Sequence, residues 1–270
     1  MRTVICHFYN EAYLLPWWLK HHRNIFDYGI MIDHNSTDES ANICRELVPH
    51  WRIVRSRLNE FDAFQTDLEV MEYERMVTGW KIVLNVTEFF MLSFPISQLE
   101  NTLLKIGKKG ITATGLIIVD NQPGIEPDIN ISLPLQKYFG IEDNEYIDVN
   151  KRYEIGLPRL IGRNRFYHCN EVGMYLPGRH SSYHQDANTR ADDIFVFHFA
   201  YAPWTEKGKL RKQQIGEKVP VQDLERNMGT DHIRNRDALE EAFLKINSHS
   251  TDLRLNEKIK ATLEYNSYKI

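Results

Sequence analysis

Polar side chains that could hold a charged ligand follow two apolar runs near the start of the chain. Residues 3–8 and 28–32 have the composition of strands, and residues 14–22 between them repeat with the period of a helix. The polar residues that follow the two runs are Tyr9, Asn10, Glu11, Asp33 and Asn35. A strand, helix, strand unit of this length predicts a parallel pair, and such sheets bind ligands just beyond the carboxyl ends of their strands. The sequence therefore predicts a binding site at Asn10, Glu11 and Asp33.

This region contains three short motifs, namely Tyr9-Asn10-Glu11, Trp17-Trp18-Leu19 and Asp33-His34-Asn35-Ser36-Thr37-Asp38. They resemble those of the family 2 glycosyltransferases of the GT-A fold. In that family the carboxylate that ends the second strand typically contacts the base or ribose of a nucleotide sugar. The resemblance implies this role for Asp33. It also implies that four neighbours help to hold the nucleotide sugar, namely Tyr9, Asn10, Glu11 and Asn35.

The run from Ser36 to Asp38 also has a structural interpretation. Ser, Thr and Asp at the start of a helix satisfy free backbone N–H groups and favour the positive end of the helix dipole. For Ser36, Thr37 and Asp38 we favour this capping role. Asp33 lies one residue too early to cap the helix, so it is the residue of this segment that the sequence assigns to a ligand.

The composition is that of a globular protein without an electrostatic bias toward nucleic acid. The 270 residues are 42% hydrophobic and 26% charged, with a formal net charge of -4 and a pI near 6.3, so no nucleic-acid partner is expected. No run of about 18 apolar residues appears, so we expect no transmembrane segment. The N-terminus shows no signal-peptide pattern, and the three widely spaced cysteines predict reduced thiols. We expect a cytoplasmic protein, with peripheral attachment to a membrane as the alternative.

Strands and helices alternate up to about residue 120, which predicts an α/β fold with a Rossmann-like, mostly parallel sheet flanked by helices. Further strands are expected at 51–54, 80–86, 110–119 and 194–199, and further helices at 39–47, 63–77, 95–106 and 204–217. The turn-rich segment 121–150 could shape an acceptor site. Residues 1–218 are predicted to form one domain, the GT-A domain of the resemblance. Residues 219–270 are predicted to be a helical C-terminal extension packed on it.

The segment 80–89 bears on metal binding. The resembled subgroup carries Asp-x-Asp-Glu-Phe after a Trp-led strand, and its two aspartates hold a divalent ion. Here the matching positions are Asn85, Thr87 and Glu88. Amide and hydroxyl oxygens replace carboxylates poorly around a hard cation, so we expect Asn85 and Thr87 to contact the nucleotide sugar without a metal bound in the usual way. Mn²⁺ or Mg²⁺ held by Glu88 and His198 is the alternative.

A late histidine and a basic helix form the second anchor of the resemblance. His198-Phe199-Ala200-Tyr201 is similar to the His-Tyr element after which, in relatives, basic residues approach the diphosphate. The resemblance implies that His198 contacts the phosphates or a metal, and that Lys207 and Lys212 lie over the phosphates. A further basic stretch could replace the metal through charge-assisted hydrogen bonds. Its members are Arg163, Arg165, His168, Arg179, His180 and His184.

An inverting transfer needs a carboxylate that accepts the proton of the acceptor hydroxyl. Asp186, Asp192 and Asp193 precede the predicted strand at 194–199, about where inverting relatives place this base. The sequence does not choose among them. We assign the catalytic roles to Asp186 and Asp193, together with Glu88, which the altered metal motif retains.

The sequence thus predicts a glycosyltransferase, inverting in mechanism, that moves a sugar from a nucleotide-sugar donor of UDP type to a glycan or other hydroxyl acceptor. Two alternatives stay open. A catalytically silent module that binds a nucleotide sugar or a glycan would explain the lost aspartates. A sugar nucleotidyltransferase shares the architecture, but its glycine-rich, basic loop is missing after the first strand, where Tyr9-Asn10-Glu11 stands.

Overall fold

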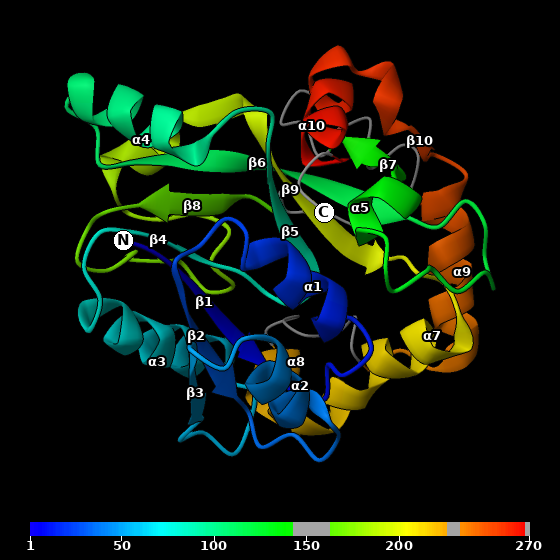
Figure 1. Ribbon diagram of the computed structural model, residues 1–270. Helices are drawn as coiled ribbons and strands as arrows, with labels where there is room; N and C mark the ends of the chain where they lie inside the picture. Colours follow the sequence, from blue (N-terminus) through cyan, green and yellow to red (C-terminus); the bar gives the residue numbers. More distant parts are fainter. Residues whose placement is uncertain (143–162, 226–232, 268–270) are drawn as a thin grey trace.

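The computed structural model describes residues 1–142, 163–225 and 233–267. A ten-stranded sheet runs through this part of the chain in the order β10-β7-β6-β8-β4-β1-β2-β3, and β9 pairs with β6 and β5 (Figure 1). The strands are β1 (Arg2–Phe8), β2 (Tyr28–Asp33), β3 (Arg52–Arg55), β4 (Trp80–Val83), β5 (Glu88–Leu92), β6 (Gly110–Val119), β7 (Phe139–Glu142), β8 (Arg165–His168), β9 (Arg190–Tyr201) and β10 (Thr251–Asp252). The helices are α1 (Leu15–His22), α2 (Ser40–Leu47), α3 (Ala63–Arg75), α4 (Ile96–Lys105), α5 (Leu133–Gln136), α7 (Glu206–Gln213), α8 (Val221–Glu225), α9 (Arg236–Asn247) and α10 (Glu257–Ser267), with short 3₁₀ turns η1 (Gln185–Asn188), η2 (Gln214–Lys218) and η4 (Leu253–Leu255).

Four neighbouring strands, β3-β2-β1-β4, are parallel to one another. Strands β1 and β2 end side by side, because Phe8 at the end of β1 is the register partner of Asp33 at the end of β2. Both faces of β1 and β2 are covered, which is why these two strands appear in the sequence as continuous apolar runs. The predicted α/β fold, with a mostly parallel central sheet flanked by helices, is confirmed.

The rest of the sheet is mixed, and here the structure corrects the sequence prediction. The run 80–86, predicted as one strand, is β4 only as far as Val83, and a turn follows. The separate strand β5 begins at Glu88 and pairs antiparallel with β9, while the unpredicted strand β8 lies antiparallel between β4 and β6. The turn was not visible in the sequence because Leu84 and Val86 are as apolar and as buried as the strand before them.

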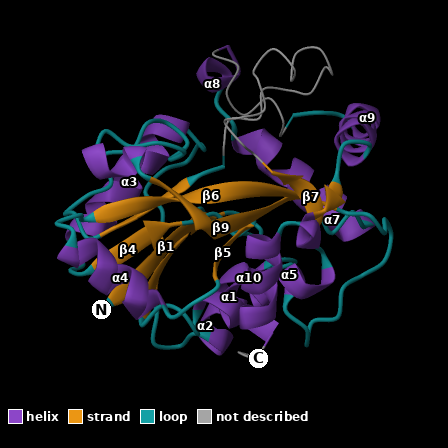
Figure 2. Cartoon of the chain, turned by 90° about the horizontal axis from the view of Figure 1, so that it is seen from above, coloured by secondary structure: helices purple, strands orange, loops and turns teal. Residues whose placement is uncertain are grey.

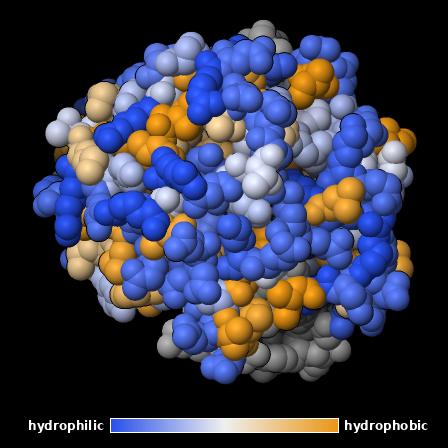
Figure 3. Space-filling view, turned by 90° about the horizontal axis from the view of Figure 1, so that it is seen from below, coloured by the Kyte–Doolittle hydropathy of each residue, from blue (hydrophilic) through white to orange (hydrophobic). Residues whose placement is uncertain are grey.

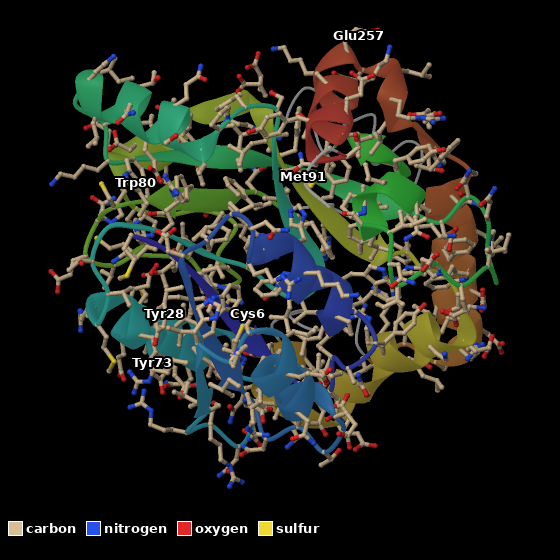
Figure 4. The ribbon with its side chains drawn as sticks, viewed as in Figure 1. Cys6, Tyr28, Tyr73, Trp80, Met91 and Glu257 are labelled. Atoms are coloured by element: carbon tan, nitrogen blue, oxygen red, sulfur yellow. The ribbon has the colours of Figure 1, made fainter. Side chains whose placement is uncertain are left out.

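The two faces of the parallel strands carry separate cores. Cys6 of β1 belongs to a large core shared with α1, α2, α4 and α10, whereas Ile5 packs with Tyr73 of α3 on the opposite face. Figure 2 shows α1, α4 and α10 on one side of the sheet and α3 on the other. Cys6 lies near the centre of the molecule and Tyr73 toward its lower left in Figure 4. Cys6, Cys44 and Cys169 are all free thiols, and the first two are buried.

The C-terminal helices share the cores of the sheet. Phe243 of α9 stacks on Trp204 with ring centroids 4.3 Å apart, and Ile259 of α10 is fully buried in the main core. In the described part of the chain, no helix has the length and apolarity needed to cross a bilayer. The surface seen from below is mostly hydrophilic, with small separate hydrophobic patches (Figure 3).

The buried His34 predicts acid sensitivity of the fold. Burial, with smaller effects of His7 and Lys218, lowers its pKa to about 4. His34 is therefore neutral in the folded protein but protonates near pH 6.5 when the chain unfolds, so its stabilising effect is complete above pH 6.5 and is lost as the pH falls toward 4. We expect His34→Phe to reduce the loss of unfolding free energy between pH 7 and pH 5 by about 1 to 2 kcal/mol in urea titrations. The exposed His50→Phe variant is the control, and equal acid dependence of all three proteins would contradict the assignment.

Candidate active site

Side chains join the loop after β1 to the loop after β2. Asn10 lies in the left-handed region with φ 50°, and its Oδ1 accepts hydrogen bonds from the backbone N–H groups of Thr37 (2.7 Å) and Asp38 (3.3 Å). In the reverse direction, the hydroxyl of Ser36 accepts from Asn10 N (3.0 Å) and that of Ser40 from Glu11 N (2.8 Å). The Asn10 side chain is thus used within the protein, so it positions the loop on which a ligand would lie.

The Ser-Thr-Asp run caps α2 only in part. The N-cap residue is Glu39, whose side chain makes no capping hydrogen bond, whereas Asp38 Oδ1 accepts from Ser40 N at the start of the helix (3.0 Å). The other oxygen, Asp38 Oδ2, accepts from Ala12 N (3.1 Å). Asp38 therefore holds the loop after β1 and the first turn of α2 together.

Asp33 is half-buried at the end of β2. Its Oδ1 accepts a hydrogen bond from Ser36 N at 2.8 Å, while its Oδ2 accepts none from the described part of the chain. Its neighbour Asn35 has φ 60° and hydrogen bonds to Arg55 and to the carbonyl of Leu58. One carboxylate oxygen of Asp33 thus remains available to a ligand, whereas the Asn35 amide links the ends of β2 and β3.

The Trp-rich helix α1 fixes the position of β5. The fully buried Trp18 donates from Nε1 to the carbonyl of Glu88 at 2.9 Å. His22 receives the backbone N–H of Phe90 on Nε2 (3.2 Å), while its Nδ1 lies 2.9 Å from the carbonyl of Trp18. This pattern requires a neutral imidazole, and burial lowers the pKa of His22 well below its usual value. Helix α1 therefore holds the start of β5, and with it Glu88, through hydrogen bonds to the backbone.

Glu88 forms a buried, two-pronged ion pair with Arg165. Arg165 Nη2 donates to Oε1 at 2.6 Å and Nε to Oε2 at 2.7 Å, and both side chains are about 0 to 1% exposed. Glu88 Oε2 also accepts from Asn85 N at 2.8 Å, which closes the turn between β4 and β5. Both carboxylate oxygens of Glu88 therefore have donors within the protein.

Asn85, at the first position of the altered metal motif, accepts a hydrogen bond from Arg179. Nη2 of Arg179 lies 2.9 Å from Asn85 Oδ1, and its Nη1 forms a buried ion pair with Asp67 of α3. Thr87, at the second position, is half-buried, and its carbonyl accepts from Phe199 N at 2.7 Å. A guanidinium group therefore contacts the first position of the altered motif.

His198 is the register partner of Glu88 and is 9% exposed. Its Nδ1 is buried without a hydrogen-bond partner in the described residues. Burial lowers its pKa well below the usual range, and the charged neighbours that lower it further are all cations, namely Arg163, Lys212, Arg165 and Arg211. His198 thus lies in a positively charged part of the site.

Helix α7 closes this edge of the sheet. Arg211 donates to Glu11 Oε1 at 2.8 Å, and Gln214 donates to the carbonyl of Asn10. Burial raises the pKa of Glu11, although Arg211 opposes that rise. Beside these contacts lies an open groove of about 640 Å³. Its lining includes Tyr13, Trp17, Asp38, Glu126, Lys207 and Arg211.

The two lysines predicted over the phosphates lie on different sides of α7. Lys207 is exposed and lines the groove. Lys212 places its Nζ 4.5 Å from the ring centre of Tyr201, and its positive charge helps to lower the pKa of His198. Tyr9 is half-buried, with Lys218 Nζ 5.1 Å from its ring centre. Only Lys212 therefore approaches the predicted histidine.

The acids predicted to act as the base lie away from this edge. Asp186 Oδ2 accepts from Lys109 N at 2.8 Å, beside the residue that begins β6. Asp192 is exposed and pairs with Lys258 of α10. Asp193 is half-buried in β9 and precedes His198 by five residues, about 16 Å of strand. The structure does not bring these acids together with Glu88.

The described residues contain no group of three or more His, Cys, Asp or Glu side chains that could hold a metal ion. Glu88 and His198 are neighbours, but the oxygens of Glu88 already accept from Arg165 and Asn85. A cation there would also face the guanidinium groups of Arg165 and Arg179. The donor set around the altered motif therefore does not suit a divalent cation.

Sequence analysis missed two residues that organise the site, Arg211 and Asp67. Arg211 lies one helical turn after Lys207, so the period of α7 could have placed both on the groove side, together with Gln214. Asp67 had no comparable signal, because an acid in the middle of an amphipathic helix is indistinguishable from a solvated one until its partner is known.

No protein-family model and no curated protein sequence matches this chain. Among solved structures, the chain is similar to S. aureus TarS 1–349, with 12% identity and a TM-score of 0.36 over 99% of this chain and 87% of that one. The same TarS segment in complex with UDP-GlcNAc gives 13% identity and a TM-score of 0.36 over the same shares. A mycobacterial protein gives 11% identity and a TM-score of 0.42 over 82% and 76%. Matches to two other TarS chains span only 38% and 43% of those chains. At these identities and TM-scores the similarities do not assign the chain to a family.

Proposed function

We propose that this protein is a GT-A-type glycosyltransferase that takes a nucleotide sugar, with UDP favoured, and transfers the sugar to a hydroxyl acceptor. The observation that carries the proposal is the convergence of motif residues from distant parts of the sequence. Asp33 ends β2 beside the loop of Asn10, Glu11 contacts α7, and Glu88 of β5 pairs in register with His198 of β9. These elements meet at the edge where parallel sheets bind ligands.

In this proposal the nucleoside lies at the end of β2. Asp33 Oδ2 is the acceptor for a ribose hydroxyl or a base N–H, and the Tyr9 ring is the neighbouring surface on which a base can stack. The Lys218 ammonium that now lies over Tyr9 would shift toward the phosphates. The diphosphate then passes across the carboxyl end of β1 toward His198 and Lys212.

The groove beside α7 suits the acceptor. Its walls combine the aromatic rings of Tyr13 and Trp17 with the polar groups of Asp38, Glu126 and Lys207, a mixture that fits the ring faces and hydroxyls of a sugar. Both oxygens of Asp38 hold backbone N–H groups, which leaves Glu126 as the groove carboxylate able to take a proton. The acceptor oxygen would form a bond to the anomeric carbon, the bond to the diphosphate oxygen would break, and the acceptor proton would pass to Glu126.

A catalytically silent binding module is the second candidate. The observation that favours it is the engagement of Glu88 by Arg165 and of Asn85 by Arg179, which leaves neither side chain for the chemistry of the resembled family. Such a module would bind the nucleotide sugar through Asp33 without turning it over.

One screen separates the two candidates. Thermal shift with UDP, GDP and a panel of nucleotide sugars, each in EDTA and in Mn²⁺, measures binding and base preference. Release of nucleoside diphosphate from the sugars that bind, with and without oligosaccharide acceptors, measures turnover. Transfer supports the enzyme, binding without release supports the module, and no stabilisation by any nucleotide excludes both.

Asp33 should dominate nucleoside affinity. We expect Asp33→Asn, which retains an acceptor for Ser36 N but loses the charge, to weaken binding of uridine and UDP alike by tenfold or more. This factor corresponds to about 1.5 to 3 kcal/mol for a charge-assisted hydrogen bond. Calorimetry measures both affinities, and the exposed Glu39→Gln on the same loop serves as the control. Unchanged affinity in a folded Asp33→Asn protein would remove the nucleoside from this position.

A further inference from the structure

The imidazole of His180 lies between two arginines. Its Nδ1 is 2.8 Å from Arg165 Nη1 and its Nε2 is 2.8 Å from Arg163 Nη1. A neutral imidazole has one acceptor nitrogen and one N–H group, so it can accept from only one of the two guanidinium groups. The protonated ring nitrogen of His180 therefore faces an N–H group of the other arginine, which is a contact between two donors. This arrangement favours the arrival of an anionic acceptor that Arg163 and His180 can share.

His198 supplies the second, independent observation. Its Nδ1 is buried and has no hydrogen-bond partner in the described part of the chain, although burying a polar atom without a partner is unfavourable. Its strongest charged neighbours include Arg163, Lys212 and Arg165. In the tautomer that carries its proton on Nδ1, this nitrogen is a donor in cationic surroundings, which suits a phosphate oxygen.

The groups behind this cluster of His180, Arg163 and His198 are held rigidly. Arg165 is fixed by both oxygens of Glu88 and donates to the carbonyl of Gly178 at 2.9 Å. Arg179, in the left-handed region with φ 61°, directly follows Gly178 at φ 88°, and its guanidinium is held by Asp67 and Asn85. Left-handed backbone is uncommon for a residue with a Cβ, and it concentrates at sites whose geometry matters. The loop therefore presents its charges without reorganisation.

We propose that Arg163, His180 and His198, with Lys212, form a metal-independent diphosphate site in place of the divalent ion of the resembled motif. The ligand class is a pyrophosphate group, as in a nucleoside diphosphate, and this identity rests on the proposed function. Arg165 and Arg179 are positioning residues, because their guanidinium groups hold Glu88, Asp67 and Asn85.

Inorganic pyrophosphate is the probe, and calorimetry in EDTA is the measurement. We expect binding that weakens as salt is raised, and a loss of affinity of at least tenfold in Arg163→Gln. Arg163→Lys, which retains the charge, should recover part of the affinity. Arg190→Gln removes a half-buried arginine of β9 and should bind normally, because its register partner on β6, Thr112, lies five residues, about 16 Å of strand, from Ile117, the partner of His198. His180→Gln tests the same cluster should Arg163→Gln fail to fold.

Three results would overturn the inference: no pyrophosphate binding in EDTA, binding only with Mn²⁺, or unchanged affinity in both folded Arg163→Gln and His180→Gln. The test is separable from that of the proposed function. Pyrophosphate binding without any nucleotide-sugar binding would leave the anion site standing and refute the transferase. Sugar transfer that requires Mn²⁺ would support the transferase and refute the metal-independent site.

Discussion

Glu88→Gln is expected to lower the free energy of unfolding by about 3 to 5 kcal/mol, because it leaves the Arg165 guanidinium buried without a counter-charge. Both partners of this pair are almost completely buried, so water cannot replace the lost carboxylate. Urea unfolding followed by circular dichroism measures the change. The sequence alone assigned Glu88 a catalytic or metal-binding role, and the structure gives it a different contribution as the residue that fixes Arg165.

A surface pair and a double variant are the controls for this prediction. Glu72→Gln removes the partner of Arg57 in an ion pair whose side chains are 49% and 61% exposed, and it should cost less than about 1 kcal/mol. Glu88→Leu combined with Arg165→Met removes both buried charges and should recover most of the stability. If Glu88→Gln unfolds like the native protein yet abolishes turnover, the carboxylate acts in the chemistry instead.

The strand ends that form the candidate site could be located from the sequence where polar residues interrupt apolar runs. The ends of β1 and β2 were predicted because Asn10 and Asp33 directly follow buried strands, and strand ends of a parallel sheet share one edge. The roles of the individual residues at that edge were harder to predict from the sequence. An amide in a turn is equally suited to a ligand and to a neighbouring loop, and the structure shows that Asn10 and Asn35 bind loops.

Partners distant in sequence were not accessible in this way. Glu88 and Arg165 are 77 residues apart, and Arg165 opens a strand of four residues, which has too little periodicity to be recognised. The basic stretch that includes Arg163 and His180 was noticed from composition, but its geometry depends on β8 lying antiparallel beside β4. The residues of the proposed anion site could therefore be named from the sequence, but their arrangement could not be predicted.

Replacing His198 is expected to reduce turnover far more than nucleoside binding. In the proposed reaction, His198→Gln removes Nδ1 from the cationic surroundings in which negative charge would grow on the leaving diphosphate, and loss of one hydrogen-bond donor there should lower kcat by about 10²- to 10³-fold. His198→Asn can keep an N–H group near the position of Nδ1 and should retain more activity. Uridine affinity should stay within about twofold in both variants, since an interaction made with the departing group contributes mainly in the transition state.

Lys212→Met extends the same test to the helix that covers the site. The ammonium group of Lys212 helps to lower the pKa of His198 and lies over the Tyr201 ring. Methionine keeps the packing of the aliphatic part of the side chain and removes the charge. We expect a loss of kcat for nucleotide-sugar cleavage with little change in uridine affinity. Lys245→Met, which removes an exposed lysine of α9 outside the proposed site, is the control. Equal losses of uridine affinity and kcat in the His198 and Lys212 variants would assign both residues to the support of the fold and would move the leaving group away from this end of β9.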